Sequence, residues 1–263
     1  MDKYLKQEIK NSFYDTISRV EKDLFLIEQN KIALNNTFVY KEEETIGLDS
    51  LEIYDGKVSV VDSNTTGAVE FENTAVLNFA SAAMIGGNPQ SGSITQEAML
   101  NRCTTLYPTL NSSQVKTEYY DYFKRINNDI YTDRMVISRN IYIIKDDQIV
   151  PNPFIRQEYL KIDVITSPAP NLSRKKLEKD EYIRIYTSRI KKIFRLAALY
   201  KNTTIIVGAF GCGMFNNPPE LAAECFKKVL FEEEYKDYFK NVVFAIPKGE
   251  NNNFKIFKEI ICE

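Results

Sequence analysis

Two segments of this chain share one order of features: an apolar run of strand length, a glycine-containing loop and the start of a helix. The first lies within residues 74–110 and the second within residues 203–229. A nearly continuous apolar run such as Thr74–Ala80 is typical of a central strand that is covered on both faces. Further strand patterns at 57–61, 161–166 and 242–246 alternate with helix patterns at 176–200 and 253–261. The sequence therefore predicts an α/β fold with a mostly parallel sheet.

The chain is 263 residues long, which suits a single α/β domain, and we predict one domain over residues 1–263. Residues 1–56 are predicted to be an N-terminal extension packed on the core. Apolar side chains recur every three or four positions in residues 3–22, which indicates an amphipathic helix. Residues 30–56 are predicted to be an extended leader with a β-prone piece at 37–40. Two short strands, 134–138 and 141–145, are predicted to pair around Arg139 and Asn140.

Charge and composition exclude several classes of function. A net charge of -2 provides no electrostatic basis for gripping a nucleic-acid backbone, so we expect no nucleic-acid partner. The chain has no histidine, which excludes every Ser-His, Cys-His and His-metal arrangement. Its four cysteines have neither metal-ligand spacing nor the density of a disulfide scaffold, so we predict reduced thiols and no metal. With no signal-like start and no run of about 18 apolar residues, we expect a cytoplasmic protein without a membrane partner. We also expect it to be a monomer.

The two glycine-containing loops, Gly86-Gly87-Asn88 and Gly208 to Gly213, both follow a strand and precede a helix. In an open α/β sheet such loops lie at the carboxyl ends of the strands, where ligands bind. If the two strands are neighbours, the loops form opposite walls of one cleft, and the N–H groups at the helix starts suit an anion. The glycine spacing fits neither the dinucleotide fingerprint nor an NTPase phosphate loop. Tight turns that need small residues remain the alternative explanation.

The first loop is followed by seven residues and then by Gln96-Glu97-Ala98. This arrangement resembles the signature of the microbial poly(ADP-ribose) glycohydrolases, in which a Gly-Gly-Gly loop precedes Gln-Glu-Glu by six to eight residues. The similarity extends through residues 77–81, 106–108, 131–134, 163–166 and 208–215. The resemblance implies a macrodomain-like three-layer α/β/α fold with a mixed, mostly parallel sheet and an N-terminal helical extension. It also implies hydrolysis of the O-glycosidic bond that joins ADP-ribose to another ADP-ribose or to a protein side chain, without a cofactor.

The resemblance assigns a role to each loop. The first loop would contact the distal ribose and diphosphate, Glu97 would hold a ribose hydroxyl, and the second loop would face the diphosphate with Phe215 packed on the distal ribose. The implied catalytic positions are Gln96, Glu97 and Ala98. The implied ligand-binding residues are Asn78, Ala80, Ser81, Gly86, Gly87, Asn88, Gly208, Ala209, Phe210, Gly211, Cys212, Gly213, Met214 and Phe215.

Two positions depart from the family pattern. Asn88 replaces the third glycine, and asparagine tolerates left-handed backbone geometry better than most residues. Ala98 occupies the position of the catalytic glutamate, and a methyl group can neither protonate a leaving oxygen nor activate water. We therefore expect the chain to bind ADP-ribose, or an ADP-ribosylated protein or polymer, and to hydrolyse it poorly.

Three explanations of Ala98 remain: a deliberate inactivating substitution, which the otherwise intact pattern favours, a natural loss that leaves a non-catalytic reader, or an enzyme that uses Glu97 or another group. A glutamate at 98 could also serve only as a helix cap, since Thr-x-x-Glu is a capping box. Likewise, Glu97 could be no more than a favourable charge in a first helical turn.

Overall fold

The computed structural model describes residues 3–47, 51–146, 155–249 and 251–262. Within these residues the chain forms one seven-stranded sheet of order β1-β4-β5-β3-β6-β7-β2. Strands β5, β3, β6, β7 and β2 run parallel to one another, whereas β4 is antiparallel to both β5 and β1. The predicted mixed, mostly parallel sheet is confirmed. The strands are β1 (Thr37–Tyr40), β2 (Lys57–Val61), β3 (Thr74–Phe79), β4 (Met135–Lys145), β5 (Ile155–Ser167), β6 (Thr204–Val207) and β7 (Asn241–Ala245).

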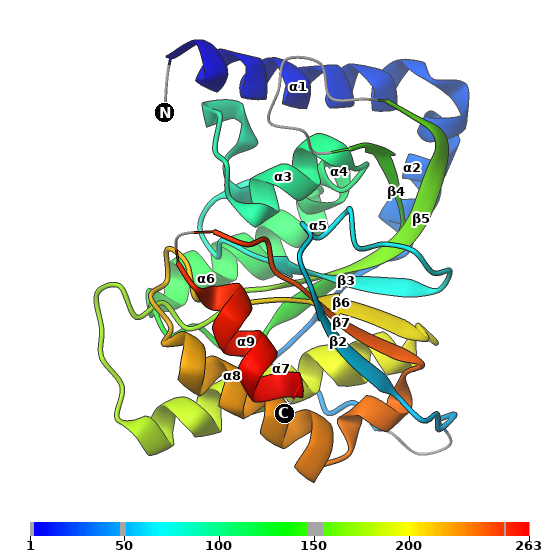
Figure 1. Cartoon of the computed structure of the whole chain (residues 1–263). Helices are drawn as coiled ribbons and strands as arrows, with labels where there is room; N and C mark the ends of the chain where they lie inside the picture. Colours follow the sequence, from blue (N-terminus) through cyan, green and yellow to red (C-terminus); the bar gives the residue numbers. More distant parts are fainter. Residues whose placement is uncertain (1–2, 48–50, 147–154, 250, 263) are drawn as a thin grey trace.

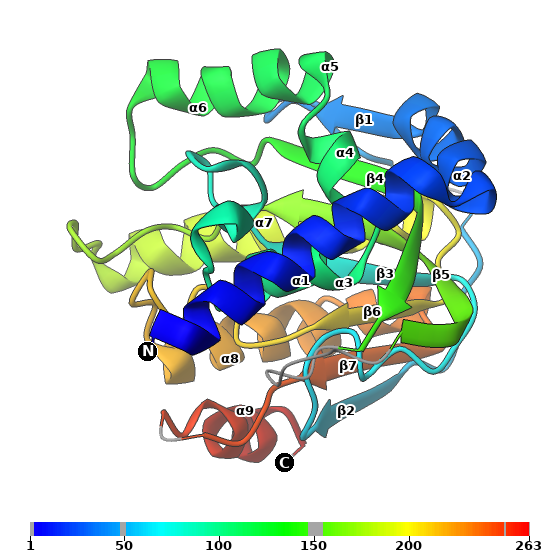
Figure 2. The ribbon, with the colours of Figure 1, turned by 90° about the horizontal axis from the view of Figure 1, so that it is seen from above.

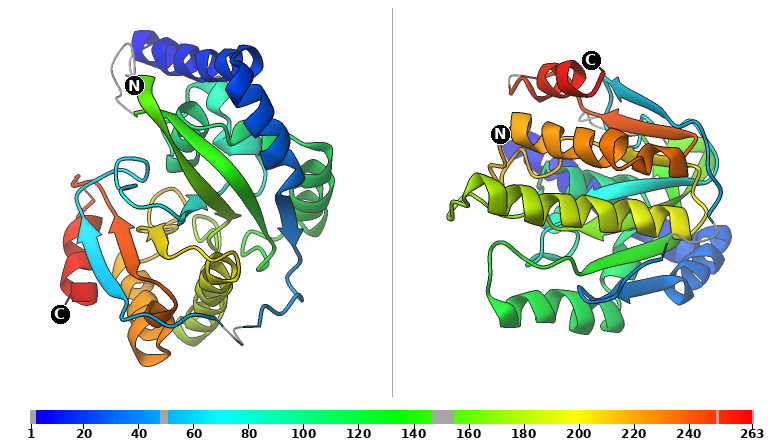
Figure 3. Two further views of the ribbon diagram at one scale, coloured as in Figure 1. Left: turned by 90° about the vertical axis from the view of Figure 1, so that its right-hand side faces the viewer. Right: turned by 90° about the horizontal axis from the view of Figure 1, so that it is seen from below.

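Helices cover both faces of the sheet, which gives the three layers expected from the resemblance (Figures 1 and 3). Alternate side chains of β3 show the division: Ala75 and Leu77 join the core beneath α7, α8 and α9, whereas Val76 joins the core beneath α3 and α6. The helices are α1 (Lys3–Lys22), α2 (Leu24–Asn35), α3 (Gln96–Cys103), α4 (Tyr107–Leu110), α5 (Ser113–Val115), α6 (Asp121–Ile126), α7 (Lys179–Leu199), α8 (Pro219–Lys227) and α9 (Asn253–Cys262). No helix in these described ranges is long and apolar enough to cross a membrane.

The first 56 residues contribute helices and a strand of the main sheet. The predicted helix over 3–22 is confirmed as α1, which crosses the molecule above α3 (Figure 2). Helix α2 occupies the start of the predicted extended leader, so that part of the prediction is wrong; Asp23 caps it by accepting a hydrogen bond from the Leu26 N–H at 3.1 Å. Strand β1 then pairs with β4 at the edge of the sheet. Residues 48–50 of the leader lie outside the described residues.

The predicted pairing of 134–138 with 141–145 is wrong, because both segments belong to the single strand β4. Its partner is β5, and the register shifts between Ser138 and Ile141. Asn140 has a φ of 60° at this bulge, and its N–H donates to Asp163 Oδ1 at 3.2 Å. Arg139 pairs with the same carboxylate at 2.9 Å. An asparagine in left-handed geometry suits a bulge as well as a hairpin turn, so the local sequence does not separate the two.

Candidate functional site

The two glycine-containing loops meet at the carboxyl edge of the sheet. Strands β3 and β6 are hydrogen-bonded parallel neighbours, with Ala75 opposite Ile205. The first loop follows the end of β3 and the second follows the end of β6, so the condition for opposite walls of one cleft is met. The rings of Phe79 and Phe210 lie 5.6 Å apart and join the roots of the two loops.

The start of α3 is fastened to the end of β3 by Gln96. Its Oε1 accepts a hydrogen bond from the Phe79 N–H at 2.9 Å, and its Nε2 donates to the Leu77 carbonyl at 2.8 Å and to Thr65 Oγ1 at 3.1 Å. The side-chain amide therefore replaces the backbone partners that the strand loses where it ends. These bonds occupy both ends of the amide, so Gln96 holds the start of α3 against the end of β3. The catalytic position that the resemblance implies for Gln96 stays a prediction.

Glu97 is buried at the centre of the site. Its Oε2 accepts a hydrogen bond from the Ser81 N–H at 2.7 Å, and its Oε1 accepts one from Asn78 Nδ2 at 3.3 Å. Asn78 is also buried and donates to Thr166 Oγ1 at 3.2 Å. Burial raises the pKa of Glu97 to about 8, and the bonds from Ser81 and Asn78 only partly oppose that shift. Near neutral pH the carboxyl group is thus mainly protonated and can donate a hydrogen bond to a hydroxyl group.

The raised pKa makes the stability of the protein depend on pH. Because the folded protein keeps the Glu97 proton up to about pH 8 and the unfolded chain releases it near 4.5, stability falls as pH rises through this window. We expect the melting temperature to fall between pH 5.5 and 8.5, and Glu97→Gln to remove much of that fall. Thermal unfolding of both proteins across this range tests it. An equal fall in both proteins would contradict the prediction.

The turn Gly86-Gly87-Asn88 lies directly over Glu97. All three residues have positive φ, of 62°, 68° and 58°. A Cβ on Gly87 would lie 3.0 Å from Glu97 Oε2 and 3.2 Å from the Ala98 nitrogen, so only glycine fits without a shift. Asn101, which the sequence analysis did not identify, supports the turn by donating to the Gly86 carbonyl at 3.3 Å. Asn88 adopts the left-handed geometry that asparagine tolerates, so the turn accommodates the departure from the third glycine.

Ala98 is the third residue of α3 and is fully buried. Its N–H donates to Thr95 Oγ1 at 3.3 Å, which is the first half of a capping box. The second half would be a side chain at 98 that accepts from the Thr95 N–H, and Ser93 Oγ takes that place at 3.4 Å. Helix capping therefore does not require a glutamate at position 98.

The second loop is held from below by Asn217, another residue that the sequence analysis did not identify. Its Nδ2 donates to the Pro170 carbonyl at 2.7 Å and to the Gly211 carbonyl at 3.0 Å. Gly211 has a φ of 77°, and a Cβ on this residue would lie 2.5 Å from Asn217 Nδ2. At the tip, Gly213 and Met214 are exposed, and nothing lies within 4 Å of a Cβ built on Gly213. The tip can thus present its backbone to a ligand.

Several predicted ligand-binding residues face the core and can contribute only backbone atoms. The Phe210 ring is fully buried, and its carbonyl accepts a hydrogen bond from the Tyr186 hydroxyl at 2.6 Å. Ala80 is buried and donates its N–H to the Ser167 carbonyl at 3.0 Å, and Gly208 lies against the Ala245 carbonyl. Burial also raises the pKa of the Cys212 thiol to about 12, so it is not a thiolate nucleophile. Ala209, Ser81 and Phe215 are partly exposed.

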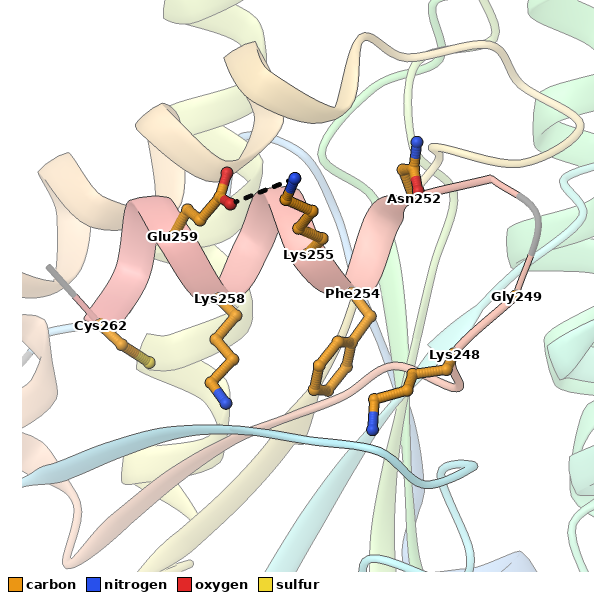
Figure 4. A pocket seen from close by; sticks show the side chains of 8 residues that line it. All are labelled: Lys248, Gly249, Asn252, Phe254, Lys255, Lys258, Glu259 and Cys262. Atoms are coloured by element: carbon orange, nitrogen blue, oxygen red, sulfur yellow. Dashed lines mark ion pairs between the residues drawn. The ribbon is translucent and has the colours of Figure 1, made fainter.

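A hollow of about 600 Å³ begins beyond the carboxyl end of β7 and continues along α9 as far as Cys262 (Figure 4). Phe254 lies between two lysines: Lys248 Nζ is 5.1 Å and Lys258 Nζ is 5.8 Å from its ring centroid. Lys248 also pairs at 3.1 Å with Asp62, the residue that follows β2. Within the described residues, no group of three or more His, Cys, Asp or Glu side chains is placed to hold a metal ion.

The glycine turns at the carboxyl ends of the neighbouring strands β3 and β6 agree with the family to which the sequence comparison assigns the chain. The model of the microbial-type poly(ADP-ribose) glycohydrolase (PARG) catalytic domain matches residues 6–146. The chain belongs to this family. Family membership makes it a glycoside hydrolase of the PARG type. No curated protein matches the chain.

Solved PARG structures share the fold along almost the whole chain. The PARG of Thermomonospora curvata superposes with a TM-score of 0.85 at 24% identity and covers 97% of this chain and 99% of its own. A second structure of that protein contains the inhibitor ADP-HPD and has a TM-score of 0.84 at the same identity, covering 96% and 99%. The PARG of Deinococcus radiodurans in complex with ADP-ribose has a TM-score of 0.75 at 26% identity and covers 88% and 96%.

Proposed function

We propose that this PARG-family chain binds ADP-ribose along the carboxyl edge of β3, β6, β7 and β2. The observation that carries the proposal is the pair of left-handed glycine turns on the neighbouring strands β3 and β6. Such turns direct backbone N–H groups toward an anion and allow close approach. The related PARG of D. radiodurans has been solved in complex with ADP-ribose, which supports this choice of ligand.

The parts of ADP-ribose match successive parts of the edge. The distal ribose would lie by Glu97, whose protonated carboxyl group can donate to a ribose hydroxyl, with Phe215 packed on its other side. The diphosphate would lie between the Gly86–Asn88 turn and the Gly211–Gly213 tip. The nucleoside would then extend toward the hollow after β7, where Phe254 offers an aromatic face.

The proposed reaction is hydrolysis of the O-glycosidic bond to the distal ribose, on poly- or mono-ADP-ribose. In the family mechanism, a glutamate at position 98 protonates the leaving oxygen and then assists water. Ala98 supplies neither step, so we propose that this chain retains binding but is impaired in catalysis. The buried methyl group also supports the second candidate, a non-catalytic reader of ADP-ribosylated partners. A cytoplasmic location and a monomeric state stay predictions.

Calorimetry with ADP-ribose tests the binding step. We expect saturable binding of one ADP-ribose per chain. AMP and ribose 5-phosphate should bind at least tenfold more weakly, because each of them fills only part of the proposed site. A tenfold loss of affinity corresponds to about 1.4 kcal/mol of binding free energy. Absence of ADP-ribose binding by both this chain and Ala98→Glu would contradict the proposed site.

A further inference from the structure

Tyr131 has a backbone conformation that tyrosine rarely adopts. Its φ is 60°, in the left-handed region. Of the other described residues with positive φ that are not glycine, six are asparagines, and the remaining two are Lys201 and Glu234. Asparagine tolerates this region, whereas a bulky side chain there is a marked outlier. Such strain persists only where the surrounding structure imposes it, and it is concentrated at functional sites.

The buried guanidinium of Arg189 holds the carbonyl groups of this turn. Arg189 lies on α7, is only 1% exposed and donates to the carbonyls of Tyr131 and Ile130, both at 3.3 Å. It also donates to the Pro168 carbonyl at 2.8 Å and pairs with Asp133 at 3.0 Å. One side chain therefore fixes the turn before β4 relative to the end of β5. Because β4 is antiparallel to β5, this turn lies at the same sheet edge as the two glycine-containing loops.

The strained turn brings the Tyr131 ring against Phe215. Their ring centroids are 6.0 Å apart, and on its other side Tyr131 packs edge-on against Phe123 at 5.4 Å. Phe215 packs with the core beneath α7 and α8, whereas Tyr131 packs with the core beneath α3 and α6. The pair thus joins the two faces of the sheet at its carboxyl edge. The Leu172 N–H fixes the backbone of Phe215 by donating to its carbonyl at 2.8 Å.

We propose that Tyr131 is a positioning residue for ligand binding: its ring, held in a strained turn by Arg189, fixes the Phe215 ring at the ribose end of the cleft. This inference rests on the proposed function, because it takes Phe215 as a ligand contact. Tyr131 itself acts through Phe215, and its hydroxyl group is not needed.

Calorimetry with ADP-ribose on substituted full-length chains tests the role of the ring. We expect Tyr131→Phe to bind as the unsubstituted chain does, and Tyr131→Asn, which tolerates the left-handed backbone but lacks the ring, to bind about tenfold more weakly, as the loss of an aromatic pair allows. Tyr142→Asn is the matched control. Tyr142 packs on Phe25 at 5.3 Å in the distal half of β4, so its loss should lower the melting temperature and leave the affinity unchanged.

A double-mutant cycle with Phe215→Ala separates positioning from a general loss of structure. If Tyr131 acts through Phe215, Tyr131→Asn should cost no further affinity once Phe215 is alanine. The inference would be overturned if the affinity losses of Tyr131→Asn and Phe215→Ala were additive in the double variant. It would also be overturned if Tyr131→Asn bound ADP-ribose as tightly as the unsubstituted chain does. Either result would leave the proposed function intact. If the unsubstituted chain does not bind ADP-ribose, both are overturned. Should Tyr131→Asn fail to fold, Tyr131→Leu keeps the apolar volume without the aromatic face and takes its place.

Discussion

Replacing Ala98 by glutamate should raise the rate of ADP-ribose release by about 10²- to 10⁴-fold, the range that a general acid-base group contributes. The new carboxyl group would stand in the first turn of α3, where the helix dipole favours a negative charge, and next to Glu97 and the Gly87 turn. The measurement is release of ADP-ribose from poly(ADP-ribose) and from mono-ADP-ribosylated protein. Comparison of the two substrates also identifies the class of bond that the site cleaves.

Ala98→Gln is the matched control for this substitution. Glutamine has nearly the same size as glutamate but has no acidic proton, so it should leave turnover at the level of the unsubstituted chain. The fully buried environment of Ala98 makes folding a necessary check, by thermal unfolding of both variants. A folded Ala98→Glu protein that binds ADP-ribose tightly without turnover would favour the reader over the hydrolase.

Replacing Gly87 by alanine should weaken ADP-ribose binding by about 100-fold. A left-handed conformation costs a residue with a Cβ roughly 1–2 kcal/mol, and the added atom would lie 3.0 Å from Glu97 Oε2 and 3.2 Å from the backbone of Ala98. The helix backbone cannot yield as a flexible side chain can, so the turn must move and carry its N–H donors away from the diphosphate. A combined cost of about 3 kcal/mol corresponds to the expected loss of affinity.

Gly56→Ala separates this local effect from general destabilisation. A Cβ at Gly56 would lie within 2.1 Å of the Lys236 carbonyl, so the steric conflict is at least as severe. Gly56 precedes β2, at the amino edge of the sheet and opposite the site. The Gly56→Ala substitution should lower the melting temperature and leave the ADP-ribose affinity of the folded protein unchanged. Equal affinity losses in both variants would contradict a specific role for the Gly87 turn.

The sequence is most informative where local pattern and tertiary environment agree. The apolar run of β3 predicts a strand covered on both faces, and the structure buries it in the middle of the sheet. Asn88 in left-handed geometry and Thr95 as the cap of α3 also follow from intrinsic preferences of these residue types. These short-range features place residues 96–98 at the start of α3, whereas their catalytic role rests on the family resemblance alone.

The supporting residues could not be found in this way, because their partners are distant in sequence. Arg189 is 58 positions from Tyr131, and Asn217 is 47 from Pro170. Nothing near Arg189 in the sequence distinguishes it from the other basic residues of the same helix. The Asn140 bulge was likewise predicted as a turn because its partner, Asp163, lies on the next strand. Long-range hydrogen bonds, rather than local propensity, decide these cases.

The place of β1 in the sheet has a consequence for synthesis of the protein. Within the described strands β1 pairs with β4 alone, and Thr37 lies opposite Ser138, about a hundred residues later in the chain. Contacts of such long sequence separation form slowly, since the intervening chain must be ordered first. Helix α2 packs on β4, so α2 lacks this surface until the ribosome has released β4. We therefore expect chains that terminate before β4 to leave part of this helix uncovered and to aggregate more readily than the full chain.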